Sequence, residues 1–211
     1  MRKLSSFSTY KAVTKGKTVS KVLFIDVEQS IDVTSIKGDY SYLKNESHSD
    51  FVNTVHEAYF HDGNALVKNL GDAKFAKQAM DEYLNAYGVD PYGYNIEGYK
   101  ITGNAVKSIT RDQSDDHLFH VVFDPVEATN NVRIQMKVFG GLDDYPTFSS
   151  IEIAVKLQDD FAPVSYQVHA TYHAKRMMDT DCVQDYTVTF SNINETIEIP
   201  NLGEIRSEYG F

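Results

Sequence analysis

Residues 151–172, IEIAVKLQDDFAPVSYQVHATY, decide the fold class. Apolar side chains alternate with polar ones on both sides of the acidic pair at 159–160, at Ile151, Ile153, Val155, Leu157, Tyr166, Val168, Ala170 and Tyr172. Successive side chains of a β-strand point to opposite faces, so this period of two predicts two half-buried strands. Neighbouring acids are typical of a turn. The stretch therefore predicts an antiparallel strand pair.

The first third of the chain shows the same alternation. Apolar residues of one parity recur from 23 to 33, at Leu23, Ile25, Val27, Ile31 and Val33. A weaker strand is expected from Phe7 to Val13, followed by a turn at Lys15-Gly16-Lys17. Asp62-Gly63 between apolar segments predicts a hairpin, because a type I′ turn needs positive φ at both central positions. We expect strands over residues 7–70.

The middle of the chain is expected to form a lid over about 72–142. Apolar residues recur at three- and four-residue spacing between Asp72, placed as an N-cap, and Gly88, which predicts a helix over 72–87. A short helix is expected over 104–111. For 125–142 two alternatives remain, a strand from the alternation of 132–138 or a helix begun by Asp124-Pro125; the cap and the proline favour the helix.

The last third is again expected to be sheet, over 148–200, with a closing strand from Thr196 to Ile199 and a surface or frayed tail over 201–211. The fold class predicted from this order is α+β. We expect one domain over 1–211, a mostly antiparallel curved sheet whose concave face is covered by two or three helices.

Charge limits the classes of partner. The chain has 211 residues and a net charge of −10. An acidic body argues against a nucleic-acid surface, which needs clustered bases. Residues 1–25 hold six bases and no acid. This basic segment either faces an anionic membrane or forms a lysine-rich edge strand.

No pattern for a nucleophile, a phosphate loop or a dinucleotide site occurs, so no enzyme and no cofactor is predicted. Cys182 is the only cysteine and is expected to be a buried, inert thiol. His169 and His173 share one face of a predicted strand and are expected to face solvent. Residues 112–116, DQSDD, lack the central glycine and distal glutamate of a calcium loop, so no metal site is predicted.

A glycine-rich loop over 88–103 holds the tyrosines Tyr92, Tyr94 and Tyr99. Tyrosine offers a flat amphipathic surface for carbohydrate, peptide or lipid. The alternative is that these rings pack the lid onto the sheet.

Three stretches together resemble the LolA/LppX-like superfamily of bacterial surface lipoproteins: HEAYFHDGNALVKNL (56–70), residues 151–172, and CVQDYT followed by VTFSNINETIEIP (182–200). The resemblance implies a half-open antiparallel barrel with helices on its concave face and a cavity for acyl chains. It also implies an extracellular location at the cell envelope and an N-terminal lipid anchor on a cysteine. The given sequence has no cysteine near its start.

Two functions follow as hypotheses. The first is an extracytoplasmic lipoprotein-type domain that binds a lipid or other hydrophobic small molecule between sheet and lid. Its ligand-binding residues are expected to be Phe75, Ala79, Met80, Tyr83, Leu84, Ile153, Val155, Tyr92 and Tyr94. The second is a non-enzymatic adhesion or interaction module of the cell envelope that uses the tyrosine loop.

Overall fold

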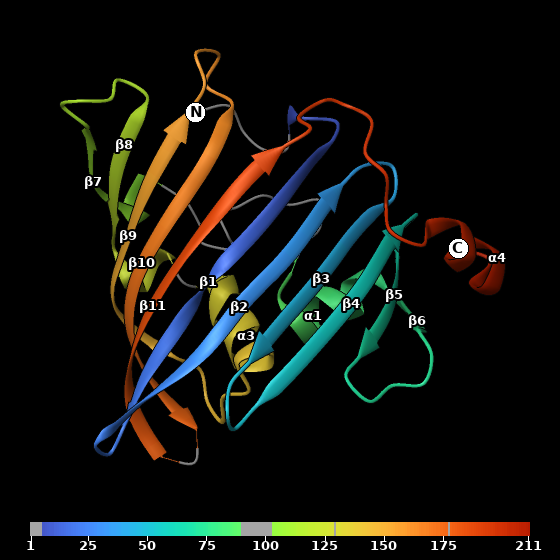
Figure 1. The fold of residues 1–211 in the computed structure, drawn as a ribbon, viewed down its shortest axis with the longest axis horizontal. Coiled ribbons are helices and arrows are strands. Elements are labelled where there is room, and N and C mark those ends of the chain that lie inside the picture. Colours follow the sequence, from blue (N-terminus) through green and yellow to red (C-terminus); the bar gives the residue numbers. More distant parts are fainter. Residues whose placement is uncertain (1–5, 90–102, 129, 177) are drawn as a thin grey trace.

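The computed structural model describes residues 6–89, 103–128, 130–176 and 178–211. Within these ranges, eleven strands form one antiparallel sheet in the order β6-β5-β4-β3-β2-β1-β11-β10-β9-β8-β7 (Figure 1). The strands are β1 (Tyr10–Val22), β2 (Ile25–Lys37), β3 (Ser41–His48), β4 (Asn53–His61), β5 (Asn64–Asn69), β6 (Ala76–Ala79), β7 (Val106–Arg111), β8 (Leu118–Phe123), β9 (Thr147–Leu157), β10 (Pro163–Arg176) and β11 (Met178–Ser191).

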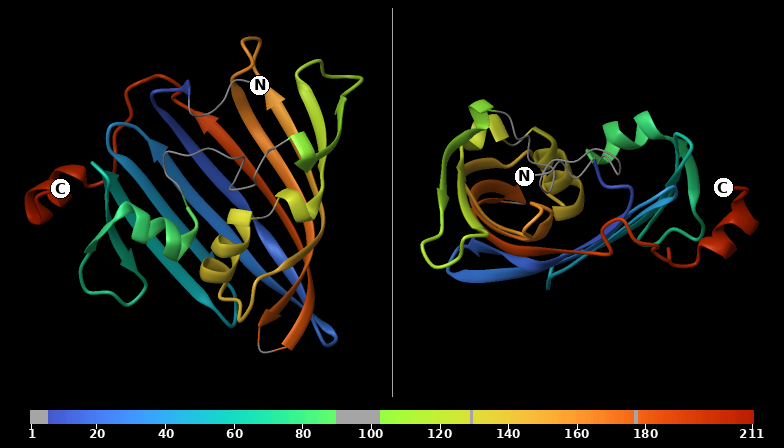
Figure 2. Two further views of the ribbon diagram at one scale, coloured as in Figure 1. Left: turned by 180° about the vertical axis from the view of Figure 1, so that it is seen from behind. Right: turned by 90° about the horizontal axis from the view of Figure 1, so that it is seen from above.

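Helices lie on both sides of this curved sheet. On the concave side are α1 (Met80–Tyr87), α2 (Pro125–Ala128) and α3 (Asn130–Gly140), with the 3-10 turn η2 (Gly103–Ala105) before β7 (Figure 2). The helix α4 (Leu202–Tyr209) lies on the outer side, beyond β4 to β6. The edge strands β6 and β7 do not meet, so the sheet is an unclosed half-barrel. The predicted α+β class is confirmed.

Two buried clusters fill the concave side at the flanks of the sheet. The first core joins β9, β10 and β11 to α2 and α3, and includes Ile153 and Val155. The second core joins β3, β4 and β5 to α1, and includes Tyr83. The central strands β1 and β2 contribute few large side chains to either core. The middle of the concave face is therefore the place where space can remain.

The helix predicted within 125–142 is confirmed as α2 and α3. Asp124 caps it, since its Oδ1 accepts hydrogen bonds from the backbone amides of Val126 and Glu127 at 3.0 and 3.2 Å. These bonds stabilise the carboxylate and lower the pKa of Asp124. Gly141, with φ of 63°, follows the end of α3, where a left-handed residue is common.

The helix predicted over 72–87 is wrong in its first half. The helix begins at Met80, and Ala76–Ala79 form β6, paired with β5. Asp72 caps no helix; its Oδ2 accepts from the backbone amide of Asn69 at 2.8 Å in a turn. Pairing to the open edge of β5 satisfies backbone groups there, and this outweighs the helical spacing.

The turn expected at Lys15-Gly16-Lys17 is also wrong, because β1 runs straight through it to Val22 and the chain turns at Leu23-Phe24. Gly16 has another role. A Cβ on Gly16 would lie 2.2 Å from the carbonyl oxygen of Asp185 and 2.4 Å from the Cα of Tyr186. Glycine thus permits a close approach of β1 and β11 in the middle of the sheet.

Two further predictions are wrong. The segment 104–111 is mainly the edge strand β7, which pairs with β8, instead of a helix. The segment 196–199 forms no strand. The tail, expected to be surface or frayed, lies at the surface and is ordered as α4. Ile205 of α4 is buried against Ile36, Tyr42, Tyr59 and Leu66 on the outer face of the sheet. Apolar side chains on that face of β2 to β5 explain why the tail folds back.

Candidate functional site

A cavity of about 370 Å³ lies between α3 and the central strands. Its floor comes from β1 and its two neighbours β2 and β11. In the middle of β1 the inward side chains are small: Ala12, Thr14, Gly16, Thr18 and Ser20. Thr14, Thr18 and Ser20 line the cavity directly. Because small residues occupy the middle strand while large ones fill the flanks, the two cores do not meet and space is left between them.

The opposite wall is one face of α3. Val132, Gln135, Met136 and Phe139 line the cavity and are three or four residues apart, so they lie on one side of the helix. Leu142 after the helix continues this wall. The wall is apolar except for the amide of Gln135, whose Nε2 donates to the backbone oxygen of Gly88 at 2.9 Å.

Contacts to β4 and to α1 hold α3 in this position. The hydroxyl of Thr54 on β4 donates to the backbone oxygen of Phe139 at 3.0 Å. The rings of Phe139 and Tyr87 of α1 stack with centroids 5.9 Å apart. With the bond from Gln135 to Gly88, these contacts join α3 to both α1 and the sheet, so the helix forms a fixed cover.

The floor carries polar but uncharged groups that bond to one another. Gln29 Nε2 donates to Ser47 Oγ at 2.7 Å, and Ser47 Oγ donates to the backbone oxygen of Ser30 at 2.7 Å. Gln184 Nε2 donates to Thr18 Oγ1 at 3.3 Å. The side chains that face the ligand space are thus fixed in place, as a preorganised site requires.

None of the residues that line this cavity is ionisable as an acid or a base in the neutral range. A buried charge without a partner is very costly, so the cavity disfavours ionised groups. Phe51 and Met178 line it and are 69% and 40% exposed, which marks where it opens to solvent. The arrangement suits an uncharged, largely apolar ligand that carries a group able to make hydrogen bonds.

Of the nine residues predicted to bind a ligand, the structure describes seven, and none of these seven lines the cavity. Tyr83 lies in the second core with Met80 packed against it, and Ile153 and Val155 lie in the first. Leu84 of α1 is half-buried. Ala79 is exposed, and Phe75 packs on the outer face against Tyr59. Tyr92 and Tyr94 lie outside the described residues, as does Tyr99. The structure therefore does not bring this set together around one space.

A sequence signal for the cavity was nevertheless present. Along β1, the small residues alternate with Lys11, Val13, Lys15, Lys17 and Val19. A strand whose inward side chains from 12 to 20 are only Ala, Thr, Gly and Ser cannot fill a core there, and this pattern indicates a hollow. The sequence prediction instead used the larger apolar side chains, which form the packed flanks.

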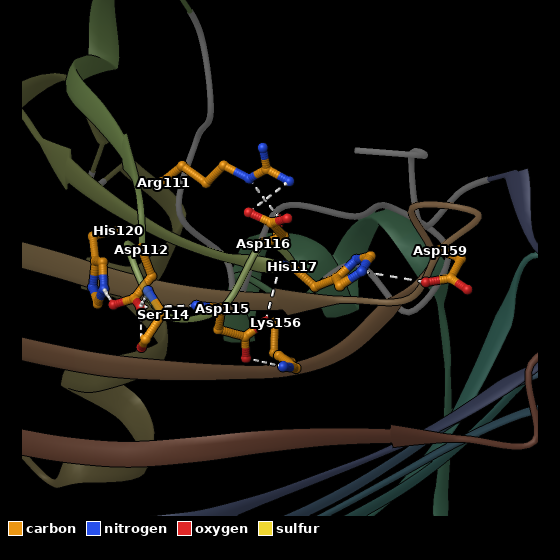
Figure 3. Close-up of polar contacts among 9 residues, drawn as sticks. All are labelled: Arg111, Asp112, Ser114, Asp115, Asp116, His117, His120, Lys156 and Asp159. Carbon is orange, nitrogen blue, oxygen red and sulfur yellow. Dashed lines mark hydrogen bonds and ion pairs between the residues drawn. The ribbon is translucent and has the colours of Figure 1, made fainter.

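The acidic stretch 112–116 is a self-contained loop between β7 and β8 (Figure 3). Asp112 Oδ1 accepts from the backbone amide of Ser114 at 2.8 Å and from its hydroxyl at 2.7 Å, which lowers the pKa of Asp112. Lys156 contacts Asp115, and His117 and His120 pair with different aspartates. In the described ranges no cluster of three or more histidines, cysteines or acids is arranged to hold a metal ion.

A wider hollow on the outer face of β1, β8 to β11 is lined by charged residues. Lys17 and Glu28 form an ion pair there with a distance of 2.6 Å, and His169 and Asp185 lie 2.7 Å apart. Both pairs are exposed, as expected for His169, and His173 is exposed on the same face. The charged groups of this hollow are therefore paired with each other and are exposed to solvent. The concave cavity is the better candidate for a ligand site.

Comparison with known proteins finds several similar solved structures, among them three that cover most of this chain. LprF from Mycobacterium bovis is 13% identical with a TM-score of 0.41, over 93% of this chain and 90% of that chain. A DUF1329 family protein from Desulfovibrio piger is 8% identical with a TM-score of 0.33, over 97% and 91%. A LolA superfamily protein from Nitrosomonas europaea is 11% identical with a TM-score of 0.29, over 95% and 90%.

No family model matches the chain, and no curated protein matches it. Across the described residues, no helix has the length and apolar character needed to cross a membrane.

Proposed function

We propose that this chain binds a lipid or a similar hydrophobic molecule in the cavity between α3 and the central strands. The observation that carries the proposal is the cavity itself, with an apolar wall from α3, a floor on which Thr, Ser and Gln side chains lie among Val27, Ile31 and Val33, and no charged residue around it. Its volume lies within the range of about 300–1,000 Å³ that small-molecule sites occupy.

The chemistry of the lining narrows the ligand class. An acyl chain would contact Val132, Met136 and Phe139, while the hydroxyls of Thr14 and Thr18 would face the polar part of the ligand. An ester or alcohol group fits such a floor, because it exchanges hydrogen bonds without bringing a charge. We propose a neutral lipid, bound by a non-enzymatic protein at the cell envelope, in keeping with the resemblance to surface lipoproteins.

Native mass spectrometry with organic extraction of the purified protein tests this function. A co-purifying lipid, or saturable binding of a fluorescent monoacylglycerol, is the expected result. The Met136→Trp variant fills the cavity from α3 and should lose most of this binding. Val138→Trp is the matched control, because Val138 lies on the same helix, is 38% exposed and does not line the cavity.

Equal binding by wild type and Met136→Trp, with unchanged melting temperatures, would overturn the cavity assignment. A clean apo mass together with no probe binding would favour the interaction module instead.

A further inference from the structure

The hairpin that joins β1 to β2 ends in four consecutive apolar residues, Val22-Leu23-Phe24-Ile25. The side chains beyond the last cross-strand pair are fully presented to solvent, with Phe24 98% exposed and Leu23 72% exposed. Ile25 is 60% exposed. We call residues 22–25 the apolar tip. A continuous exposed apolar segment on a soluble surface marks an interaction site.

The turn chemistry of the apolar tip is unfavourable by local rules. Val22 pairs with Ile25, so Leu23 and Phe24 form a two-residue turn, and Leu23 has φ of 57°. That region is strained for a residue with a branched side chain and is normally taken by Gly or Asn. The hairpin from β4 to β5 uses Asp62-Gly63 with φ of 45° and 70°. Folding alone does not explain Leu and Phe at the first turn.

The apolar tip lies beside the mouth of the cavity. Val22 of the tip lines the cavity, and so do Val27 next to the tip and exposed Met178 at the start of β11. Because Ser20 pairs with Cys182, the β10–β11 hairpin ends at the same side of the molecule as the β1–β2 hairpin. Figure 1 shows both hairpin ends projecting from the lower margin of the sheet.

A pair of charged residues flanks the apolar tip, one on each strand. Lys21 pairs across the strands with Asp26, and both are exposed. The end of the apolar tip lies about two residues beyond Lys21 and Asp26, which corresponds to about 7 Å along a strand. The tip can therefore enter an apolar phase to about that depth before these charges have to be buried. Segments that lie in a membrane interface bury their apolar side to about 5–10 Å.

We propose that the apolar tip inserts into the surface of a lipid bilayer with uncharged headgroups. A narrow protruding tip can be surrounded by the fluid lipids of a bilayer. A protein partner would instead need a broad complementary face. The lysines of β1 do not call for anionic lipid, since Lys15 and Lys17 are paired with Asp32 and Glu28 and Lys21 faces Asp26. Insertion of the tip would also bring the mouth of the cavity to its lipid, and this consequence rests on the proposed function. The insertion itself does not depend on that function.

Flotation with phosphatidylcholine vesicles tests the proposal. The variant combining Leu23→Asn with Phe24→Gly installs a favoured turn, so its melting temperature should stay equal or rise. Its vesicle partition should fall on the order of 100-fold, from the loss of two large apolar side chains. The matched control is Phe161→Asn in the β9–β10 turn, where Phe161 is 56% exposed with φ of 64° at the opposite end of the sheet.

Phe161→Asn should float like the wild type. Failure of the wild type to float, equal losses in both variants, or binding only when anionic phosphatidylglycerol is added would overturn the proposal. Self-association of the wild type in lipid-free buffer, abolished by the turn variant, would assign the apolar tip to a second copy of the chain instead.

The two proposals fail separately. Leu23 and Phe24 do not line the cavity, so the turn variant should bind the soluble monoacylglycerol probe as the wild type does. Met136→Trp should lose the probe and still float with vesicles. Loss of flotation by Met136→Trp would show that bound ligand, and not the apolar tip, drives the membrane contact, and would overturn the insertion proposal.

Discussion

The Nε2 atom of His56 on β4 lies 2.9 Å from the hydroxyl of Tyr83 on α1. His56 Nδ1 lies 2.9 Å from Oδ1 of Asn69, a pure acceptor, so Nδ1 carries the proton and Nε2 accepts from Tyr83. Both side chains are buried, and burial lowers the pKa of His56. A neutral imidazole thus fixes α1 to the sheet beside the cavity cover.

Stability should fall as the solution is acidified below pH 6.5. The unfolded chain takes up a proton at His56 near its ordinary pKa of 6.5, while the folded chain keeps the ring neutral to lower pH. Protons therefore favour the unfolded state, and the loss is complete at the lowered folded pKa. Above pH 6.5 this group adds no pH dependence. Urea unfolding from pH 5 to 8 measures the effect.

The variant His56→Gln removes the titrating group and keeps hydrogen-bonding capacity towards Asn69 and Tyr83. Subtracting its profile from that of the wild type cancels other groups, including exposed His173, whose pKa is raised by Asp181. An identical slope in both proteins between pH 5 and 6.5 would contradict the assignment to His56.

Tyr83→Phe should destabilise the protein by about 1–3 kcal/mol, because it leaves the buried Nε2 of His56 without its donor. The ring itself stays, so packing against Phe60 at 4.8 Å is retained. Tyr145→Phe, at an exposed tyrosine, is the control and should be near neutral. Chemical denaturation provides both values, and equal effects would argue against the hydrogen bond.

Gly16→Val should reduce stability by about 2 kcal/mol or more, on the order expected for overpacking against rigid atoms. The added Cβ meets the backbone of Asp185 and Tyr186, which cannot move without separating β1 from β11. Gly203→Ala is the matched control, because nothing lies within 4 Å of the place that its methyl group would take, and alanine favours the helix. Thermal melting should show a loss for the first and none for the second.

Ile205→Ala should cost about 2–4 kcal/mol, the range for deleting a buried aliphatic side chain. Ile205 is 6% exposed and covers Tyr42 and Tyr59 on the outer face. Glu208→Ala, at an exposed position of the same helix, serves as the control. Unchanged unfolding midpoints in Ile205→Ala would mean that α4 contributes little to the fold.

A neutral lipid probe should bind more tightly than a fatty acid of equal chain length at pH 7. The cavity lining offers no cation for a carboxylate, so ionisation opposes entry. Fatty-acid affinity should increase as the pH falls and the ligand becomes neutral, while the affinity of a monoacylglycerol stays flatter. Fluorescence titration at pH 5 and 8 checks this, and tighter binding of the ionised acid would contradict the neutral-ligand assignment.

The sequence predicted strands wherever one face had to be buried. The alternation at Ile151 to Leu157 and the turn at Asp62-Gly63 are both local signals, and both elements form as expected. The cap at Asp124 is equally local. Edge pairing is not local: whether Ala76–Ala79 extends the sheet depends on β5 having an open side, which the spacing of Phe75, Met80 and Tyr83 does not show.

A cavity between sheet and lid was expected, but its lining residues were not predicted, for a related reason. A prediction that follows large apolar residues finds packed cores, and Ile153 and Val155 are packed. The hollow lies where side chains are small, and its position depends on β1 standing in the middle of the sheet between β2 and β11. That placement comes from pairing between the two ends of the chain, which no short stretch encodes.

The same pairing sets the order in which the molecule can assemble. Ser20 and Cys182 are cross-strand partners 162 residues apart, so the floor of the cavity is completed only when the last strand meets the first. Closing so long a loop is entropically costly, and such contacts slow folding. During synthesis β1 therefore keeps one side unpaired until β11 has also been made.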